Sequence, residues 1–238
     1  MSKVSVVIPC LNDDSELAAC LGQLPRDDPD TEVIVADASP DDACADIAHQ
    51  FGATLVRCGR TGRGCQLNEG AAAATGDILV FNHADSELHA GHLRALRAVM
   101  SDSRIVGGAF HRDVAWQYPA LAWMTGTSRH YTKRFGYLYG DQSVFVRRET
   151  FEAMGRFADV SIMEDLEFSP RLRKAGRIAL LDPPIRASVR RFQNRGYLRN
   201  KLQNLLIIWA WRLGLVTPDQ VYEKYYGRSP ASKPAARR

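Results

Sequence analysis

The chain has 238 residues, of which 45% are hydrophobic and 24% charged, and its formal net charge at pH 7 is +4. This length and composition are typical of one globular domain with a packed core. The positive excess is small and no nucleic-acid-reading motif accompanies it, so we expect no nucleic-acid partner. A membrane span needs ~20 apolar residues, and the longest apolar run, from Leu205 to Ala210, is far shorter.

The cysteines are scattered along the chain without a C-x-x-C pair. An odd number of cysteines in a chain of this length predicts free thiols in a reducing compartment. A strand-like run begins at residue 4, so we expect no signal peptide and a cytoplasmic protein. The five cysteines are Cys10, Cys20, Cys44, Cys58 and Cys65.

Short β-branched runs alternate with helical segments in the first part of the chain. This alternation predicts a parallel sheet covered by helices on both faces. Ligands of such sheets lie beyond the carboxyl ends of the strands, where loops begin at Pro9, Asp37, Arg57 and Asn82. We expect strands at 4–8, 33–36, 54–56 and 77–81, and helices at 14–24, 41–51, from the glycine-rich loop 59–64 to residue 74, and from about residue 90.

The second part of the chain is less regular. Its pattern predicts helices at 117–135, 164–175 and 196–214 and a short strand at 143–146. The tail, 228–238, is rich in Pro, Ala, Ser and Arg and is predicted to be disordered.

Two well-known nucleotide-binding motifs are absent. The first strand ends in Pro9-Cys10-Leu11-Asn12 with no G-x-G-x-x-G, which argues against a classical dinucleotide fold. Gly59, Gly62 and Gly64 lack the G-K-[ST] of a P-loop.

Polar side chains follow two of the expected strands. Asp37 can accept a hydrogen bond from a base or ribose, or it can form a turn that caps the next helix. His83 and Asp85 are two residues apart and point the same way in extended backbone. An Asp oxygen suits magnesium or manganese bound to phosphate, although Asp85 or Ser86 can equally cap the helix that follows.

Two further polar groups lie in the second half. Glu164 and Asp165 open a helix, where acids are favoured by the helix dipole and where one of them can act as a general base. Gly140-Asp141-Gln142 forms either a tight turn or a substrate-facing loop. His89 and His92 have the spacing of a zinc pair, but an exposed helix face is the better interpretation.

A basic stretch over residues 186–201 precedes the apolar run Leu205–Trp209, and Trp211 follows. Basic residues beside a Trp-rich apolar surface suit peripheral contact with the inner face of a membrane, and with it a lipid-linked ligand. The alternative, which the pattern favours, is a core helix with solvated charges.

Taken together, these segments resemble family 2 glycosyltransferases of the GT-A fold. The resemblance runs from Lys3 to about Arg177 and rests on the order and spacing of its segments. The subgroup pattern is that of the bacterial radical-SAM/selenodomain-associated transferase 2 set. The segments that match the family are 4–9, 32–37, 63–70, 74–77 and Glu164-Asp165, and those that match the subgroup are 83–85, 139–142 and 162–165.

The sequence departs from the family pattern at three places. Asp37 is followed by Ala38 where the family usually has a second acid, and the usual Asp-x-Asp metal motif has His83 in its first position. The Gln-x-x-Arg-Trp motif of processive synthases is absent, with only a partial likeness at 190–192. The last departure favours transfer of a single sugar over polymerisation.

The resemblance implies an α/β fold of GT-A type with a mostly parallel sheet flanked by helices. It implies one catalytic domain over 1–227, with a nucleotide-binding half at about 1–115, an acceptor-side half at about 116–195 and C-terminal helices at about 196–227. The implied activity is metal-assisted, inverting transfer from a nucleotide-diphosphate sugar to an acceptor hydroxyl. The cofactor would be magnesium or manganese.

The resemblance also assigns roles to residues. Asp165 would be the general base, Glu164 would position it, and Asp85 would hold the metal. The donor nucleotide would lie against Pro9, Leu11, Asp37, Arg63, Asn68, His83 and Ala84, and the acceptor against Asp141 and Gln142.

Two alternatives stay open at this stage. A nucleotidyltransferase on a related sheet would need a glycine-rich, lysine-bearing first loop, which residues 9–12 do not offer. An inactive nucleotide-sugar-binding protein gains support from His83 in the metal motif. Donor hydrolysis with and without manganese separates the inactive protein from an enzyme.

Overall fold

The computed structural model describes residues 2–25, 27–113, 137–186 and 197–226. A seven-stranded sheet in the order β3-β2-β1-β4-β6-β5-β7 forms its centre. The strand pairs are parallel except for β6, which is antiparallel to both β4 and β5. This confirms the α/β fold with a mostly parallel sheet. The strands are β1 (Val4–Cys10), β2 (Thr31–Asp37), β3 (Thr54–Arg57), β4 (Ile78–Phe81), β5 (Ile105–Arg112), β6 (Val144–Arg147) and β7 (Arg177–Ile185).

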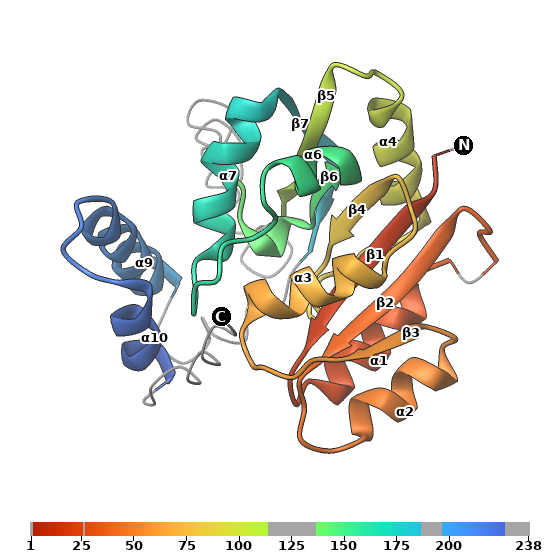
Figure 1. The fold of residues 1–238 in the computed structure, drawn as a ribbon, viewed down its shortest axis with the longest axis horizontal. Coiled ribbons are helices and arrows are strands. Elements are labelled where there is room, and N and C mark those ends of the chain that lie inside the picture. The colour runs from red at the N-terminus through yellow and green to blue at the C-terminus, as the bar shows by residue number, and fades with distance from the viewer. Residues whose placement is uncertain (1, 26, 114–136, 187–196, 227–238) are drawn as a thin grey trace, which may run out of the picture.

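Helices cover both faces of the sheet (Figure 1), and each face has its own hydrophobic core. Alternate residues of β1 point into the two cores. Val6 and Ile8 pack in the core under α1, α2 and α4. Val7 packs in the core under α3, α6 and α7. The helices are α1 (Asp14–Gln23), α2 (Ala43–Gln50), α3 (Arg63–Ala73), α4 (Ala90–Met100), the 3-10 turn η2 (Gly140–Gln142), α6 (Arg148–Ala153), α7 (Glu164–Ala175), α9 (Tyr197–Arg212) and α10 (Pro218–Tyr226).

Two strands and two short helices were not expected from the sequence: β5, β7, α6 and α10. β5 contains two adjacent glycines, and a Cβ on Gly108 would lie 1.9 Å from the carbonyl oxygen of Ala179 on β7. β7 contains Pro183 and Pro184, which the sheet accommodates because β7 is an edge strand. The helix expected at 117–135, the tail at 228–238 and most of the basic stretch lie outside the described residues.

The amino-terminal edge of the sheet is held together by the carboxylate of Glu32. It accepts hydrogen bonds from Ser5 Oγ (2.5 Å), from the backbone N–H (2.5 Å) and hydroxyl (2.8 Å) of Thr75, and from the N–H of Gly76 (3.0 Å), and it pairs with Lys3. Burial by itself would raise the pKa of Glu32, but these hydrogen bonds outweigh it and lower the pKa to about 2. Residues 74–77, part of the family-like pattern, therefore have a structural role far from the ligand edge.

We expect Glu32→Gln to lower the free energy of unfolding by about 1–3 kcal/mol near neutral pH, because the charged acceptor is lost. A lowered folded-state pKa gives stability that is present above the unfolded pKa and is lost as pH falls through the folded one, so the deficit should shrink from about pH 5 to about pH 3. Urea unfolding followed by circular dichroism measures both values. Glu152→Gln is the matched control, since its ion pair with Arg156 is exposed and contributes under about 1 kcal/mol. If the loss in free energy of unfolding in Glu32→Gln did not change with pH, the lowered pKa of Glu32 would be contradicted.

Candidate active site

The carboxyl ends of β1 and β2 are joined by a buried amide of α3. Gln66 Nε2 donates to the carbonyl oxygens of Cys10 (2.7 Å) and Ala36 (3.0 Å). Pro9 and Leu11 are half-buried at this edge. β1 extends through Pro9 to Cys10, two residues beyond the expected end. Proline has no backbone N–H, but β4 pairs with β1 only as far as Val7, so no hydrogen bond to β4 is lost at Pro9. The edge is therefore fixed before any ligand binds.

Asp37 ends β2 and is fully buried. Its carboxylate accepts a hydrogen bond from the N–H of Ser39 (2.8 Å) and pairs with Arg57 Nη1 (2.7 Å) at the end of β3. Arg57 also donates to the backbone of Asp41 (2.9 Å) and pairs with Asp42. Arg57, which the sequence did not single out, thus fixes both the carboxylate and the loop that follows it.

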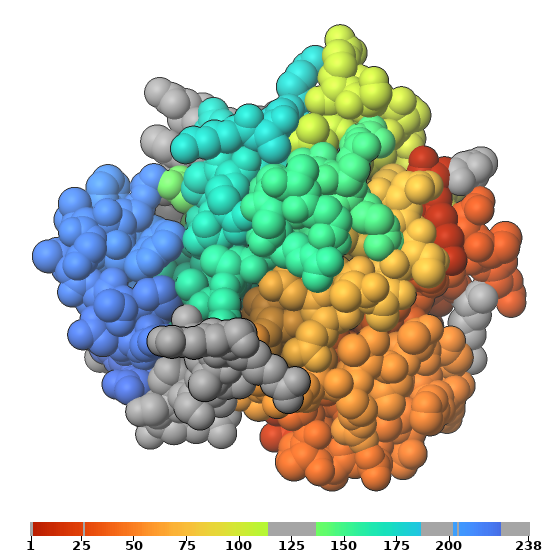
Figure 2. Space-filling view, viewed as in Figure 1, coloured from red at the N-terminus to blue at the C-terminus, as the bar shows by residue number. Residues whose placement is uncertain are grey.

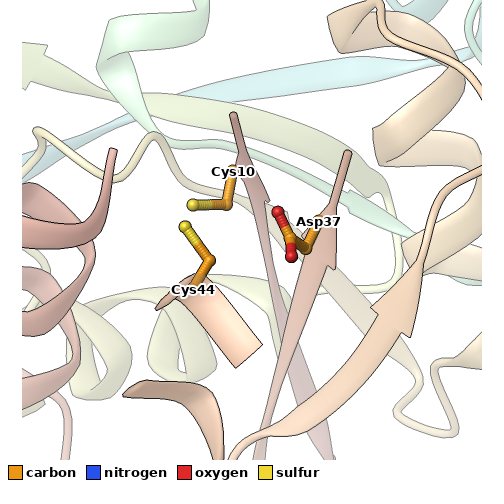
Figure 3. Close-up of side chains that lie close together, drawn as sticks. All are labelled: Cys10, Asp37 and Cys44. Atoms are coloured by element: carbon orange, nitrogen blue, oxygen red, sulfur yellow. The ribbon is translucent and has the colours of Figure 1, made fainter. Parts of the chain in front are cut away.

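Among the described residues, one group of three potential metal ligands lies close together: Cys10, Asp37 and Cys44 (Figure 3). Their ligand atoms are within 4.8 Å of one another and all three residues are buried. Burial, together with the neighbouring Cys44, raises the pKa of the Cys10 thiol well above its usual range. Metals bind the thiolate, and a diphosphate-bound cation prefers oxygen, so this group is a packed thiol pair and not the predicted metal site.

The turn after β4 is organised by Asn82, which is completely buried. Asn82 Nδ2 donates to the carbonyl oxygens of His83 (3.0 Å) and Ser86 (3.3 Å), while its Oδ1 accepts from Ser143 Oγ. This leaves His83 half-buried and Asp85 exposed. Ala84 is 7% exposed and packs in the core, so only its backbone could face a ligand.

Glycine at position 140 lets the two halves of the chain meet. A Cβ on Gly140 would lie 2.6 Å from Nε2 of His83 and 3.6 Å from Oδ2 of Asp165. The Gly140 N–H donates to that same oxygen of Asp165 at 2.7 Å. The imidazole of the β4 turn and the carboxylate of α7 therefore lie against one bare face of Gly140.

Glu164 and Asp165 point in different directions from the first turn of α7. Glu164 is 1% exposed and its Oε1 lies 3.4 Å from Nη1 of Arg63, the first residue of α3. Asp165 is half-buried beside Gly140. Burial, and then the charge of Glu164, raise the pKa of Asp165 to about 7, against the hydrogen bond from Gly140 and the charge of Arg63. Asp165 is thus a carboxylate that can exchange a proton near neutral pH.

Two residues that are predicted to contact ligands, Asn68 and Gln142, also hydrogen-bond to backbone groups. Both oxygen and nitrogen of the Asn68 amide pair with the backbone of Phe157, at 3.1 and 3.0 Å. The Gln142 amide is buried, accepting from the N–H of Tyr139 (2.9 Å) and donating to the carbonyl oxygen of Phe110 (3.2 Å). Both amides therefore hold the surrounding backbone, and their contact with a donor or an acceptor stays a prediction.

Asp141 lies beside Gly140 on η2 and pairs through Oδ2 with Arg112 Nη1 at 2.8 Å. Its other carboxylate oxygen is buried and has no hydrogen-bond partner among the described residues. A buried acceptor without a partner is costly, so this oxygen is suited to receive a donor group from a ligand.

His89 and His92 do not form an exposed face. His89 caps α4 through its side chain, and His92 is 1% exposed. Burial, followed by the effect of His89, lowers the pKa of His92 to about 4. Both imidazoles therefore have structural roles.

Comparisons with known proteins agree with this architecture. The structure superposes on a mannosyltransferase of Pyrobaculum calidifontis, solved with GDP-mannose and Mn²⁺, with a TM-score of 0.67, 20% identity, and coverage of 93% of this chain and 68% of that one. It also superposes on glucosyl-3-phosphoglycerate synthase of Mycobacterium tuberculosis, solved with Mn²⁺, UDP-glucose and glycerol 3-phosphate, with a TM-score of 0.62, 21% identity, and coverage of 92% and 82%. These likenesses confirm the GT-A fold.

Sequence comparison adds relatives of higher identity. An uncharacterized glycosyltransferase of Mycobacterium tuberculosis is 36% identical over 112 residues, which cover 47% of this chain and 50% of that protein. A 4,4'-diaponeurosporenoate glycosyltransferase of Staphylococcus haemolyticus is 34% identical over 104 residues, covering 41% and 27%. The match thus spans at most about half the length of these relatives. The family model for Glycosyl transferase family 2 matches residues 5–160, and the chain therefore belongs to glycosyl transferase family 2.

Proposed function

We propose that the chain transfers a single sugar from a nucleotide-diphosphate sugar to an acceptor hydroxyl, with inversion at the anomeric carbon. The observation that carries this proposal is the position of Asp165. It lies at the face of Gly140 beside His83, next to the turn that bears Asp85, and its pKa is raised to about 7. A base is most effective when its pKa is near the working pH.

The donor would occupy the carboxyl edge of β1, β2 and β4. Asp37, oriented by Arg57, would accept a hydrogen bond from the base or ribose, with Pro9 and Leu11 beside it. Arg63 would lie near the diphosphate while holding Glu164. His83 and the backbone of Ala84 would lie on the sugar side.

A divalent cation such as magnesium or manganese fits Asp85. Its exposed carboxylate is a hard oxygen donor, and within the described residues it belongs to no cluster of three ligands. Mg²⁺ typically uses one or two carboxylates and completes its shell with phosphate oxygens and water. When bound, such an ion offsets the charge that builds up on the leaving diphosphate.

In the reaction, Asp165 would accept the proton of the acceptor hydroxyl as its oxygen attacks the anomeric carbon. The bond from that carbon to the diphosphate oxygen breaks, and the nucleoside diphosphate leaves with the electron pair. Attack from the side opposite the leaving group inverts the configuration. Glu164, held by Arg63, would position the first turn of α7, and Asp141 would bind the acceptor through its second oxygen.

The metal assignment predicts the behaviour of Asp85→Asn. Binding of UDP or GDP in manganese should weaken by at least about tenfold, and binding in EDTA should change little, because only the metal-dependent part is lost. Isothermal titration calorimetry measures both. Asp14→Asn removes another exposed acid that follows β1 and serves as the control. Unchanged affinity of Asp85→Asn in manganese would remove Asp85 from the site.

The base assignment predicts the behaviour of Asp165→Asn. We expect turnover to fall by about two to four powers of ten, the usual contribution of general-base catalysis, with donor affinity nearly unchanged. A thermal-shift screen of nucleotide sugars in manganese identifies the donor, and its hydrolysis or transfer is then followed. Glu164→Gln should cost less. If Glu164→Gln abolishes turnover while Asp165→Asn does not, the two roles are exchanged; if neither matters, Asp141 is the next candidate.

The raised pKa of Asp165 has a consequence for stability that does not depend on activity. A folded-state pKa above the unfolded value gives stability that is complete below the unfolded pKa and is lost as pH rises through the folded one. Asp165→Asn should therefore gain about 1–3 kcal/mol relative to the wild type between about pH 5 and about pH 8. Urea unfolding of both proteins in EDTA tests this. If the difference in free energy of unfolding between Asp165→Asn and the wild type were the same at both pH values, the raised pKa of Asp165 would be ruled out.

A further inference from the structure

Helix α9 is apolar on two opposite faces. Ile207, Ile208 and Trp211 pack in a cluster with Tyr137, Met163 and Leu166, which ties the helix to the start of α7. Leucine and tryptophan side chains on the other face stay exposed: Leu202 58%, Leu205 42%, Leu206 61% and Trp209 51%, continued by Leu213 67% and Leu215 71%.

At about 100° per residue, the exposed side chains from Leu202 to Leu213 fall within one arc of the helix, and the packed ones fall opposite. α9 lies beyond α7, on the side of the molecule away from β3 (Figure 1), and its surface forms part of the blue lobe at the left of Figure 2. The five exposed residues from Leu202 to Leu213 are called the α9 outer face below. A contiguous exposed apolar face of this kind marks an interaction surface.

The charge of the adjoining sequence points to the kind of partner. Between Pro183 and Pro218 the sequence has seven Lys or Arg residues and no Asp or Glu, whereas the rest of the chain has 24 Lys or Arg against 27 Asp or Glu. Arg212, at the end of α9, is exposed and its guanidinium lies over the rings of Trp209 and Tyr137, at 5.7 and 4.6 Å. A concentrated positive charge disfavours docking of a second copy through the same region. It favours an anionic surface.

We propose that the α9 outer face docks on the surface of an anionic lipid bilayer. Leucine and tryptophan side chains enter the boundary between headgroups and acyl chains, and Arg212 at the end of α9 pairs with lipid phosphates. No helix among the described residues is long and apolar enough to cross a membrane, so the contact is peripheral. Because Met163 and Leu166 flank Glu164 and Asp165 and pack with α9, docking would hold the acidic end of the site close to the lipid.

The test is co-sedimentation of the full chain with vesicles of phosphatidylglycerol and phosphatidylcholine, compared with phosphatidylcholine alone. We expect binding to the anionic vesicles that weakens strongly between about 0.05 M and 1 M salt, where the Debye length becomes shorter than ~10 Å. The double variant Leu206→Asn, Leu213→Asn should bind at least about tenfold more weakly, because both side chains are solvent-exposed in the free protein and apolar contact is lost only on lipid. Trp fluorescence should shift to the blue on binding, and less so in Trp209→Phe.

Arg212→Gln should weaken binding, whereas Arg104→Gln, which removes an exposed arginine at the start of β5, should not. Circular dichroism and thermal unfolding establish that each variant is folded. Absence of binding at low salt, or equal binding by the double variant, would overturn the proposal. So would a concentration-dependent dimer without lipid that the double variant abolishes, because the outer face would then join two copies of the chain. None of these outcomes depends on the catalytic role of Asp165.

Discussion

The approach of His83 and Asp165 to the bare face of Gly140 is the contact on which the site depends. His83 belongs to the turn after β4 and Asp165 to the start of α7, and they meet because β6 runs antiparallel between β4 and β5. The strand reversal brings η2 against the end of β4. A Cβ at position 140 would lie 2.6 Å from Nε2 of His83 and would displace the imidazole, so glycine lets the imidazole occupy this position beside Asp165.

Two acids of this protein show how the environment, and not the residue type, sets proton affinity. Glu32 is surrounded by hydrogen-bond donors and Lys3, and its pKa is lowered to about 2. Asp165 receives two backbone N–H groups, but burial and the adjacent Glu164 prevail and its pKa is raised to about 7. The first arrangement stabilises the fold near neutral pH and the second costs stability there. The fold thus tolerates an unfavourable environment for a charged carboxylate at Asp165, whereas the environment of Glu32 favours the charged form.

The sequence predicts those parts of the structure that depend on local pattern. β1 to β4 follow from β-branched runs, and the placement of Asp37 and Asp85 follows from their position after buried strands. β5 and β7 were missed because β5 contains adjacent glycines and β7 contains prolines, which are uncommon in strands. The close approach of β7 to β5 and the edge position of β7 allow these residues in the sheet. The backbone contacts of Arg57, Asn68, Asn82 and Gln142 involve partners distant in sequence, so no local pattern indicates them. The polar residue directly after a predicted buried strand, Asn82, was the one sequence feature that could have indicated a side chain that holds the following turn.

His83 in place of the first acid of the metal motif is compatible with this arrangement on electrostatic grounds. A carboxylate at position 83 would lie close to Asp165, which already shares its surroundings with Glu164. A third negative charge would raise the pKa of Asp165 further, and a base that stays protonated at neutral pH cannot accept a proton. An imidazole fills the same space, packs against Gly140 and adds no negative charge. In the proposed metal site, histidine would offer one fewer oxygen ligand, so Asp85 and the donor diphosphate would have to hold a larger share of the coordination shell of the metal. If Asp165 is the base, as proposed above, histidine at position 83 would lower metal affinity while keeping the pKa of Asp165 in a usable range, so its presence is compatible with an active enzyme.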